Sequence, residues 1–338
     1  MRILVIGATG FIGAYVVRLL VQQGHDLAIL HRGQTTANFA GHVLHIYGDR
    51  NALADIQPRL EEFGPEVVLD IIGYTERHAQ GLVDVCRGVA QRVVVLSSAD
   101  VYRSYDGFRG NATAPPESVP LSEDAPLRET RYPYRGYGLA FDWADDYDKI
   151  LVERTVLGVP DLPGTVLRLP AVYGPGDQQH RVGAYLRRMD DGRPAILLAQ
   201  GQGEWRWTRG YVENVAAAVA LAVTDDRSVG RIYNVGEELA LTEREWIEMI
   251  GAAAGWTGTV VTIPAEQMPK HLRQPYDFRY HIATCTDRIR AELGYDEPIQ
   301  RGEALRRTIK WERSQFVESD EQDYAAEDTA LSARNDAT

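Results

Sequence analysis

The stretch Gly7-Ala8-Thr9-Gly10-Phe11-Ile12-Gly13 lies near the start of the chain, where one sequence pattern gives way to another. The residues before it, Arg2 to Ile6, form a short run of mostly aliphatic side chains that predicts a buried strand. The segment Phe11 to Gln23 carries apolar side chains at helical spacing and contains no proline. The sequence therefore predicts a strand, a tight glycine-rich turn and a helix in direct succession.

The three glycines of this turn have separate physical roles. Gly7 permits the tight turn, Gly10 lets the backbone approach a diphosphate, and Gly13 lets the helix pack closely against the strand. The N-terminus of the helix favours an anion, because its first N–H groups lack partners and point at the ligand. This context predicts the phosphate-binding turn of a Rossmann-type dinucleotide-binding domain. A glycine-rich turn without a ligand is the alternative interpretation.

The rest of the first half repeats the alternation of strand and helix. Such alternation is typical of parallel βαβ units, so we expect an α/β fold with a doubly wound parallel sheet. The pattern becomes mixed after Gly174, which predicts a smaller, mixed α/β lobe. The expected strands are 26–30, 42–47, 66–72, 92–96, 165–169 and 195–198, and the expected helices are 51–63, 76–89, 143–157, 182–190, 212–223, 242–254 and 303–313.

Three parts of the chain are expected to differ in role. Residues 1–174 form the dinucleotide-binding domain, to which 211–236 return, and residues 175–313 form a substrate-binding lobe. The segment from Tyr102 to Gly138 is rich in Pro, Gly and Tyr and is too long for a simple connection, so it is a candidate functional loop. Residues 314–338 hold seven acids against one base, with little periodic apolar pattern. They are expected to form a disordered acidic tail.

Composition excludes several classes of partner. The formal net charge of −12 argues against a nucleic acid, whose phosphates require clustered Lys and Arg. No stretch reaches the ~20 apolar residues that span a bilayer, so no membrane association is expected. Cys86 and Cys285 are far apart and have no C-x-x-C partner, so neither a disulfide nor a metal site is expected. A cytoplasmic location fits this cysteine usage best.

The end of the second expected strand bears on the choice of cofactor. An NAD-binding domain usually places an acid there to bind the ribose hydroxyls. Here the strand ends with His31 and Arg32, while Asp26 lies at its opposite end. Arg32 is thus available for a 2′-phosphate, and we expect NADP in preference to NAD. Asp49 is placed to meet the adenine edge, or else is a simple turn residue.

Several further segments occur in a fixed order along residues 1 to 313. They are Ser97 to Tyr102 after a strand, Lys149 in a helix, Arg168 to Pro175, Tyr211 to Val215 and Tyr233 to Gly236. Together with the glycine-rich turn they resemble the extended short-chain dehydrogenase/reductase family, the NAD(P)-dependent epimerases and dehydratases that act mainly on nucleotide sugars. The resemblance implies a homodimer and the following residues at the cofactor: Gly7, Thr9, Gly10, Phe11, Ile12, Gly13, His31, Arg32, Asp49, Arg50, Ile72, Lys149, Pro170 and Val172.

The resemblance breaks at the central catalytic position. In the family, a Tyr beside a Lys four residues later exchanges a proton with the substrate hydroxyl while hydride moves to or from the nicotinamide, and a Ser helps to orient that hydroxyl. The Ser corresponds to Ser98 and the Lys to Lys149, which would also bind the nicotinamide ribose, but the Tyr position holds Asp145. On the expected helix Asp145 and Lys149 share a face, either as a functional pair or as a salt bridge that only steadies the helix.

Other groups could replace the missing phenol. Tyr147 stands two residues from Lys149 and would point to a different face of the helix. Asp100 follows Ser98 by two residues, where the resemblance to dehydratases implies a carboxylic acid that moves a proton beside a carbonyl. A turn carboxylate at a strand end is the alternative for Asp100. The long loop offers three phenols that could act on the substrate or merely cover it: Tyr132, Tyr134 and Tyr137.

Arginines interleaved with aromatic residues predict the substrate class. In Trp205-Arg206-Trp207-Thr208-Arg209-Gly210-Tyr211, the guanidinium groups suit phosphate and the rings suit a base or sugar. Arg279 could supply a further cation, so we expect an anionic, ring-bearing substrate. The expected substrate contacts are Tyr102, Tyr137, Tyr173, Arg206, Arg209 and Arg279.

The sequence leaves three functions open. The first is an NADP-preferring oxidoreductase, epimerase or dehydratase for a nucleotide-linked or similar polar substrate. The second is a non-catalytic protein that senses the redox state of its bound cofactor, which the missing Tyr favours. The third is an RNA-binding relative of the chloroplast stem-loop-binding members of the superfamily, against which the acidic charge argues.

Overall fold

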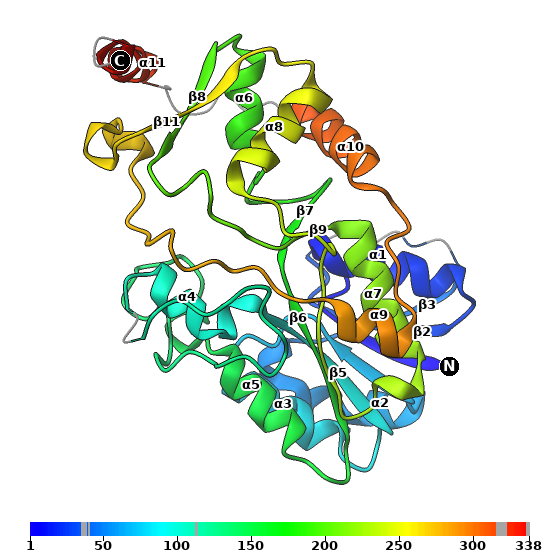
Figure 1. Ribbon diagram of the computed structural model, residues 1–338. Helices are drawn as coiled ribbons and strands as arrows, with labels where there is room; N and C mark the ends of the chain where they lie inside the picture. Colours follow the sequence, from blue (N-terminus) through cyan, green and yellow to red (C-terminus); the bar gives the residue numbers. More distant parts are fainter. Residues whose placement is uncertain (35–38, 40, 112–113, 316–322, 336–338) are drawn as a thin grey trace.

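The computed structural model describes residues 1–34, 39, 41–111, 114–315 and 323–335. Its largest unit is a seven-stranded sheet of order β10-β6-β5-β4-β1-β2-β3, in which all neighbouring strands are parallel (Figure 1). These strands are β1 (Arg2–Ile6), β2 (Asp26–His31), β3 (Val43–Tyr47), β4 (Val67–Asp70), β5 (Arg92–Ser98), β6 (Gly164–Leu169) and β10 (Ile232–Asn234). The predicted doubly wound parallel sheet is confirmed. The chain reverses its direction of travel between β1 and β4, and open sheets of this kind bind ligands at such a switch point.

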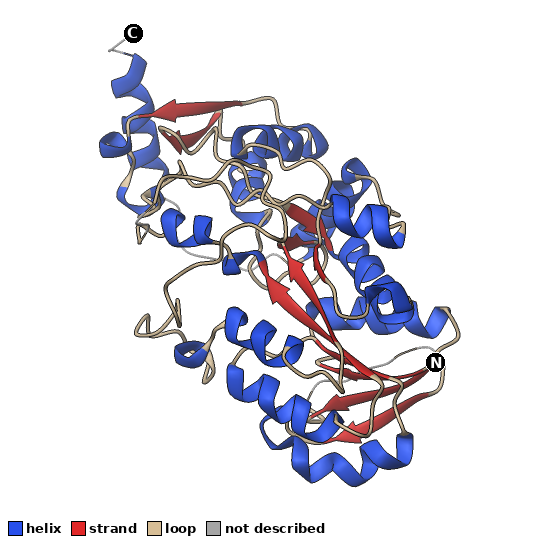
Figure 2. Ribbon diagram, turned by 60° about the horizontal axis from the view of Figure 1, so that its bottom comes forward, coloured by secondary structure: helices blue, strands red, loops and turns tan. Residues whose placement is uncertain are grey.

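Alternating residues of the strands face two helical layers, which lie on opposite sides of the sheet (Figure 2). Ile3 and Val5 pack with α1 (Phe11–Gln22) and α7 (Val212–Thr224), whereas Leu4 and Ile6 pack with α3 (Glu76–Cys86) and α5 (Lys149–Leu157). All four of these β1 side chains are at most 1% exposed. A strand covered on both faces reads as a continuous apolar run, as Arg2 to Ile6 does.

A second lobe lies beyond the carboxyl ends of the strands (Figure 1). Its sheet pairs β8 (Ala195–Ala199) with β11 (Thr259–Ile263), and β7 (Ala171–Tyr173) pairs with β9 (Arg209–Tyr211) nearer the main sheet. The remaining α-helices are α2 (Gln57–Phe63), α4 (Arg103–Phe108), α6 (Gly183–Asp190), α8 (Glu243–Ala254), α9 (Asp287–Leu293), α10 (Arg301–Ser314) and α11 (Tyr324–Asn335). Within the described ranges, the helices are all too short or too polar to cross a membrane.

The helix expected over 143–157 is wrong in its first part. A short 3-10 turn spans Ala144–Asp146, and α5 begins only at Lys149. The carboxylate of Asp148 explains this start, because it accepts hydrogen bonds from the N–H groups of Ile150 and Leu151 and caps the helix. Asp145 and Lys149 therefore do not lie on one helix.

The disordered tail expected over 314–338 is also wrong in part, because α10 continues to Ser314 and α11 packs on the second lobe. Glu327 of α11 is completely buried and pairs with Arg188 of α6 at 2.8 Å and with His271 at 3.0 Å. Ala330 packs in a small apolar cluster with Leu197 and Met268. A buried ion pair of this kind requires a fixed docking geometry, which local sequence composition does not reveal.

Candidate functional site

The predicted phosphate turn is built as its glycines require. Gly7 has a φ of 90°, a left-handed conformation that side chains rarely adopt. A Cβ atom at Gly13 would clash with the carbonyl oxygen of Gly7, so the first turn of α1 approaches the loop more closely than any larger residue permits. Gly10 is the N-cap of α1 and supplies no side-chain cap. The first N–H groups of the helix thus remain available to an anion.

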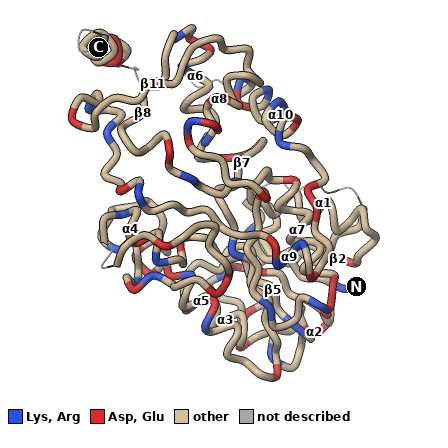
Figure 3. Tube along the Cα trace, in the orientation of Figure 1, with Lys and Arg blue, Asp and Glu red and all other residues tan. Residues whose placement is uncertain are grey.

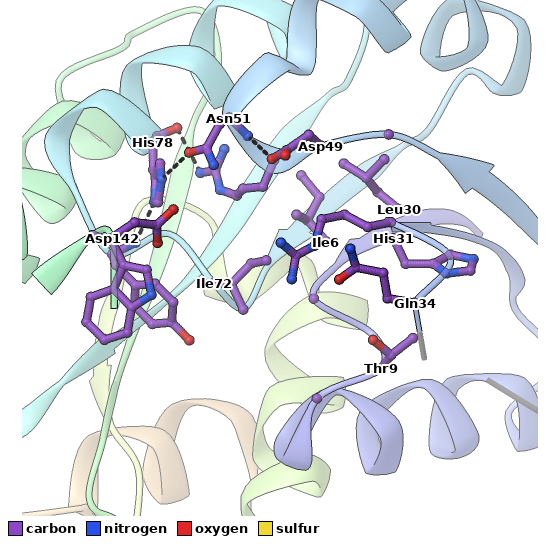
Figure 4. A pocket seen from close by; sticks show the side chains of 17 residues that line it. Ile6, Thr9, Leu30, His31, Gln34, Asp49, Asn51, Ile72, His78 and Asp142 are labelled. Carbon is purple, nitrogen blue, oxygen red and sulfur yellow. Dashed lines mark hydrogen bonds between the residues drawn. The ribbon is translucent and has the colours of Figure 1, made fainter. Parts of the chain in front are cut away.

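A pocket lies beside this turn, at the carboxyl ends of β1 and β2 (Figure 4). Of the residues predicted at the cofactor, Gly7, Thr9, Gly10, His31, Arg32, Asp49, Arg50 and Ile72 line it. The sequence missed its other lining residues, which are Ile6, Leu30, Gln34, Gly48, Asn51, Tyr74, His78, Asp142 and Trp143.

Arg50 lines the pocket and has hydrogen-bond donors that an anionic cofactor could use. Its guanidinium pairs with the buried carboxylate of Asp70 and donates to the carbonyl oxygen of His78 at 2.8 Å. Its Nε and Nη1 atoms are buried and have no hydrogen-bond partner within the described part of the chain. Buried donors without partners are costly, so a polar ligand that accepts from them would stabilise the site. The turn and Arg50 together fit a dinucleotide.

His78 fixes the opposite wall through two hydrogen bonds. Its Nδ1 accepts from the N–H of Tyr74 at 3.2 Å, so its Nε2 carries the proton that it shares with Asn51 Oδ1 at 2.9 Å (Figure 4). Burial, reinforced by the nearby Arg50 cation, lowers the pKa of His78 to about 4. His78 is therefore a neutral structural group near pH 7. The backbone N–H of Asn51 also donates to the Asp49 carboxylate, which makes Asp49 a turn residue.

Aromatic rings form the remaining side of the pocket. Trp143 stacks on Tyr74 with ring centroids 4.3 Å apart, and Phe141 stacks on Trp143 at 4.9 Å. The Lys149 ammonium lies 4.9 Å from the centroid of the Tyr74 ring. Tyr74 follows β4 closely and Trp143 precedes α5, so only the fold brings these rings together.

Lys149 occupies a central position between the ends of β4 and β5. Its Nζ donates to the carbonyl oxygens of Gly73 at 2.9 Å and Leu96 at 2.7 Å. Burial lowers its pKa to about 8. The ammonium thus lies behind Tyr74, close to the wall of the pocket.

Asp145, predicted to replace the family's Tyr, lies elsewhere. It is exposed, and its carboxylate accepts a hydrogen bond from the N–H of Gly136 at 2.9 Å. The prediction that Asp145 and Lys149 share a helix face is wrong, because α5 begins only at Lys149. Asp145 is a surface residue that steadies the neighbouring loop.

Asp100 is buried in a cluster with two phenols, Tyr147 and Tyr134. Tyr147 donates to Asp100 Oδ2 at 2.7 Å, and Tyr134 donates to the same oxygen at 3.3 Å. The Oδ1 atom is buried and has no partner among the described residues. Burial raises the pKa of Asp100, although Arg128 opposes this effect. Ser98, two residues before Asp100, is partly exposed. Its hydroxyl oxygen accepts a hydrogen bond from the Asp100 N–H at 3.2 Å.

Two of the phenols expected at the substrate are parts of the core. Tyr102 is 0% exposed, and its hydroxyl donates to Asn234 at 2.6 Å. Tyr173 is 1% exposed and donates to Glu237 at 2.9 Å. The prediction that these two residues contact the substrate is wrong, because both are buried among other side chains. Tyr137 is exposed, with its ring 4.6 Å from Arg109.

Two of the arginines expected at the substrate form ion pairs with other residues of the chain. Arg209 is buried against Glu243 and lies over the ring of Trp246. Arg279 pairs with Asp277 on the surface.

Arg206 is half-exposed, and it donates to the Ala240 carbonyl oxygen at 2.8 Å and lies 4.0 Å from Glu245. Of the three, Arg206 keeps the weakest ion pair and remains the best-placed candidate for an anion.

The other residues predicted at the cofactor have different surroundings. Phe11, Ile12 and Val172 pack in or against the core on the α1 side of the sheet. Pro170 separates β6 from β7. These four residues support the crevice rather than line the pocket.

Fold and site together define a Rossmann-type nucleotide-cofactor protein with a buried carboxyl group and two phenols near the carboxyl edge of its sheet. The chain belongs to the NAD dependent epimerase/dehydratase family, whose model matches residues 3–236. The resemblance inferred from the motifs is thereby confirmed.

Relatives differ in their activities. The chain is 27% identical to a 2'-dehydrokanamycin reductase of Streptomyces kanamyceticus, over 80% of this chain and 72% of that protein. It is 22% identical to the chloroplast stem-loop binding protein of 41 kDa b of Arabidopsis thaliana, over 98% and 85%. The structure of the Thermus thermophilus UDP-glucose 4-epimerase complex with NAD superposes with a TM-score of 0.65 at 24% identity, covering 94% of this chain and 100% of that one. The last likeness shows the fold alone.

Charge is mixed over both lobes. Lys and Arg are interspersed with Asp and Glu over the described residues (Figure 3). Many of the arginines are in ion pairs, among them Arg168 with Glu153 and Arg128 with Asp148, both buried. Such pairing directs these cations toward the interior of the fold.

Proposed function

We propose that this protein is an NADP-preferring oxidoreductase, epimerase or dehydratase that acts on a nucleotide-linked or similar polar substrate, with Asp100 as its acid–base group. The observation that carries the proposal is the buried, unpartnered Oδ1 atom of Asp100 beside Ser98. A raised pKa suits a carboxyl group to proton transfer near neutral pH.

The residues divide the work by position. A nicotinamide cofactor, when bound, would supply or accept the hydride. The glycine turn and Arg50 would bind the dinucleotide, and the Lys149 ammonium would supply a positive charge to its ribose. Ser98 orients the substrate hydroxyl, because its O–H is free to donate while its oxygen accepts from the Asp100 N–H. Asp100 Oδ1 then takes or returns the proton.

The preference for NADP rests on Arg32. It lines the pocket, is exposed, and makes no ion pair within the described residues. The neighbouring His31 is bonded to His45 at 2.9 Å, and burial lowers the His31 pKa, so His31 is neutral at pH 7. Arg32 is thus the cation of this wall that suits a 2′-phosphate.

The test begins with fluorescence titration of the apo-protein by NADPH and NADH. Oxidation of the reduced cofactor is then followed with a panel of nucleotide sugars and related carbonyl compounds. We expect tight binding and substrate-dependent oxidation, with kcat reduced about 100-fold or more in Asp100→Asn. The control Asp145→Asn, an exposed carboxylate away from this cluster, should retain wild-type turnover. Tight binding without turnover on any substrate would instead favour the cofactor-sensing protein, and absence of binding would refute both.

A further inference from the structure

Asp100 is joined to the protein surface by an unbroken chain of hydrogen bonds. Tyr134 donates to Asp100 Oδ2 at 3.3 Å. Because the single proton of that phenol is used, the 2.8 Å contact between the Tyr134 and Tyr105 hydroxyls has Tyr105 as its donor. Arg109 in turn donates to the Tyr105 oxygen at 3.4 Å. In this series of hydrogen bonds, every donor therefore points toward the buried carboxylate.

We propose that Tyr134 and Tyr105 form a proton relay that connects Asp100 with solvent beside Arg109. The inference rests on the proposed acid–base role of Asp100. A buried carboxyl group that exchanges a proton with substrate must return to its starting state after each turnover. Asp100 is only 6% exposed, which restricts direct proton exchange between its carboxyl group and bulk water.

The relay transfers a net of one proton, and no heavy atom changes its bonding partners. Asp100 takes the proton of Tyr134, Tyr134 takes the proton of Tyr105, and Tyr105 takes a proton from a solvent hydronium ion or buffer acid. Each phenol again has one O–H bond at the end, and the net change is one proton from solvent to the carboxylate. The reverse sequence releases a proton.

Arg109 has a defined part in this transfer. A guanidinium does not give up its proton in proteins, so Arg109 is not a member of the relay. Its positive charge stabilises the negative charge that develops on Tyr105, and its guanidinium lies 5.5 Å from the centroid of the Tyr134 ring. No carboxylate pairs with Arg109 in the described structure, whereas many other arginines of the fold are paired.

The outer end of the relay lies at the surface. Tyr105 and Arg109 are both partly exposed. Tyr105 belongs to α4, Tyr134 to the long loop and Asp100 to the turn after β5, so three separate segments supply the path. The charged and titratable groups around Asp100 are Arg128, Tyr147, Lys149, Tyr134 and Tyr105. Burial raises the pKa of both relay phenols, which keeps them protonated as donors at rest.

The test follows the protonation of Asp100 itself and needs no substrate. The carbonyl stretch of the protonated carboxyl, assigned by its absence in Asp100→Asn, is recorded by time-resolved infrared spectroscopy after a pH jump. We expect protonation to be about tenfold slower in Tyr105→Phe and Tyr134→Phe than in the wild type. Tyr105→Phe is the sharper variant, because it leaves the hydrogen bond of Tyr134 to Asp100 intact and should leave the midpoint of the titration unchanged.

Tyr132→Phe is the matched control. Its ring lies 3.9 Å from the Arg135 guanidinium, in the same loop and outside the relay, so its rate should equal that of the wild type. Wild-type rates in Tyr105→Phe, equal slowing in Tyr132→Phe, or a carboxyl that does not titrate over the pH range in which the protein remains folded would each overturn the relay. Turnover that requires Asp100 together with a wild-type rate in Tyr105→Phe would remove the relay alone. Cofactor binding without turnover would remove the enzyme function alone.

Discussion

Tyr147 donates a 2.7 Å hydrogen bond to Asp100 Oδ2, although the two residues are 47 positions apart and Tyr147 was expected to point away from the reacting groups. The phenol is 7% exposed and its centroid lies 6.3 Å from that of Tyr74, a wall residue of the cofactor pocket. Its partner is thus the carboxylate rather than the Lys149 ammonium. A phenol is therefore present beside Asp100, but Tyr147 supplies it from the segment before α5 and not from α5 itself.

Replacing Tyr147 should move the titration of Asp100. Its hydrogen bond lowers the Asp100 pKa, so Tyr147→Phe removes a stabilising donor from the ionised form and raises that pKa. A hydrogen bond to a charged group contributes about 1.5 kcal/mol or more, so we expect an upward shift of about one unit. The pH at which kcat/KM reaches half its maximum should move by the same amount. An unchanged profile in a folded variant would show that the bond has no influence on the reacting state.

Removing the Arg32 cation should change the choice between cofactors. Arg32→Ala should weaken NADPH binding by about tenfold and leave NADH binding nearly unchanged, because NADH lacks the 2′-phosphate. Competition titrations of both reduced cofactors with wild type and variant measure the ratio. Arg18→Ala on α1, whose guanidinium lies 5.5 Å from the Tyr15 ring, removes a similar charge outside the pocket lining and serves as control. Equal losses for NADPH and NADH would contradict the assignment.

Stability should fall on the acid side because of His78. Its folded-state pKa of about 4 is below the usual 6.5, so the unfolded chain binds more protons between these values. The free energy of unfolding is therefore undiminished by this group above about pH 6.5 and decreases as the pH falls toward 4. At pH 5 the expected loss is about 2 kcal/mol. Denaturant unfolding at pH 7 and pH 5 should show that His78→Gln loses less stability on acidification than the wild type. Equal losses would exclude His78 as the source.

Docking of α11 should depend on Glu327. Glu327→Gln leaves Arg188 without its charge partner in a buried setting, which we expect to reduce the free energy of unfolding by about 1–3 kcal/mol. Limited proteolysis should also cut the chain faster after α10. Asp328→Asn is the adjacent control, since Asp328 is mostly exposed where it pairs with Arg193. If both variants resist protease like the wild type, the buried pair does not hold the helix.

The parts that local sequence determines were predictable. The turn from Gly7 to Gly13 needs only its own glycines and the flanking patterns, and its geometry is the expected one. Tyr102, by contrast, is buried with its hydroxyl bonded to Asn234, which is 132 residues away. No periodicity identifies such a partner, and the sequence therefore did not separate buried phenols from reachable ones.

The start of α5 shows a signal that could have been used. Asp148 stands directly before Lys149-Ile150-Leu151, and Asp is a favoured N-cap residue. This pattern predicts a helix that begins at Lys149 and leaves Asp145 in the preceding turn. The partnership of Tyr147 with Asp100 had no comparable signal, because it forms only when the segment before α5 lies beside the end of β5.

The way α11 docks has a practical consequence for molecules joined to the chain. The C-terminal end of the described chain lies on the second lobe, far from the N-terminus beside β2 (Figure 1). A reporter protein or surface tether attached there would be held by Glu327 and its two partners rather than swing freely. Pulling on that attachment would first load the contacts of α11 with α6 and the β8–β11 sheet, whereas pulling on Met1 would load β1, an interior strand of the main sheet.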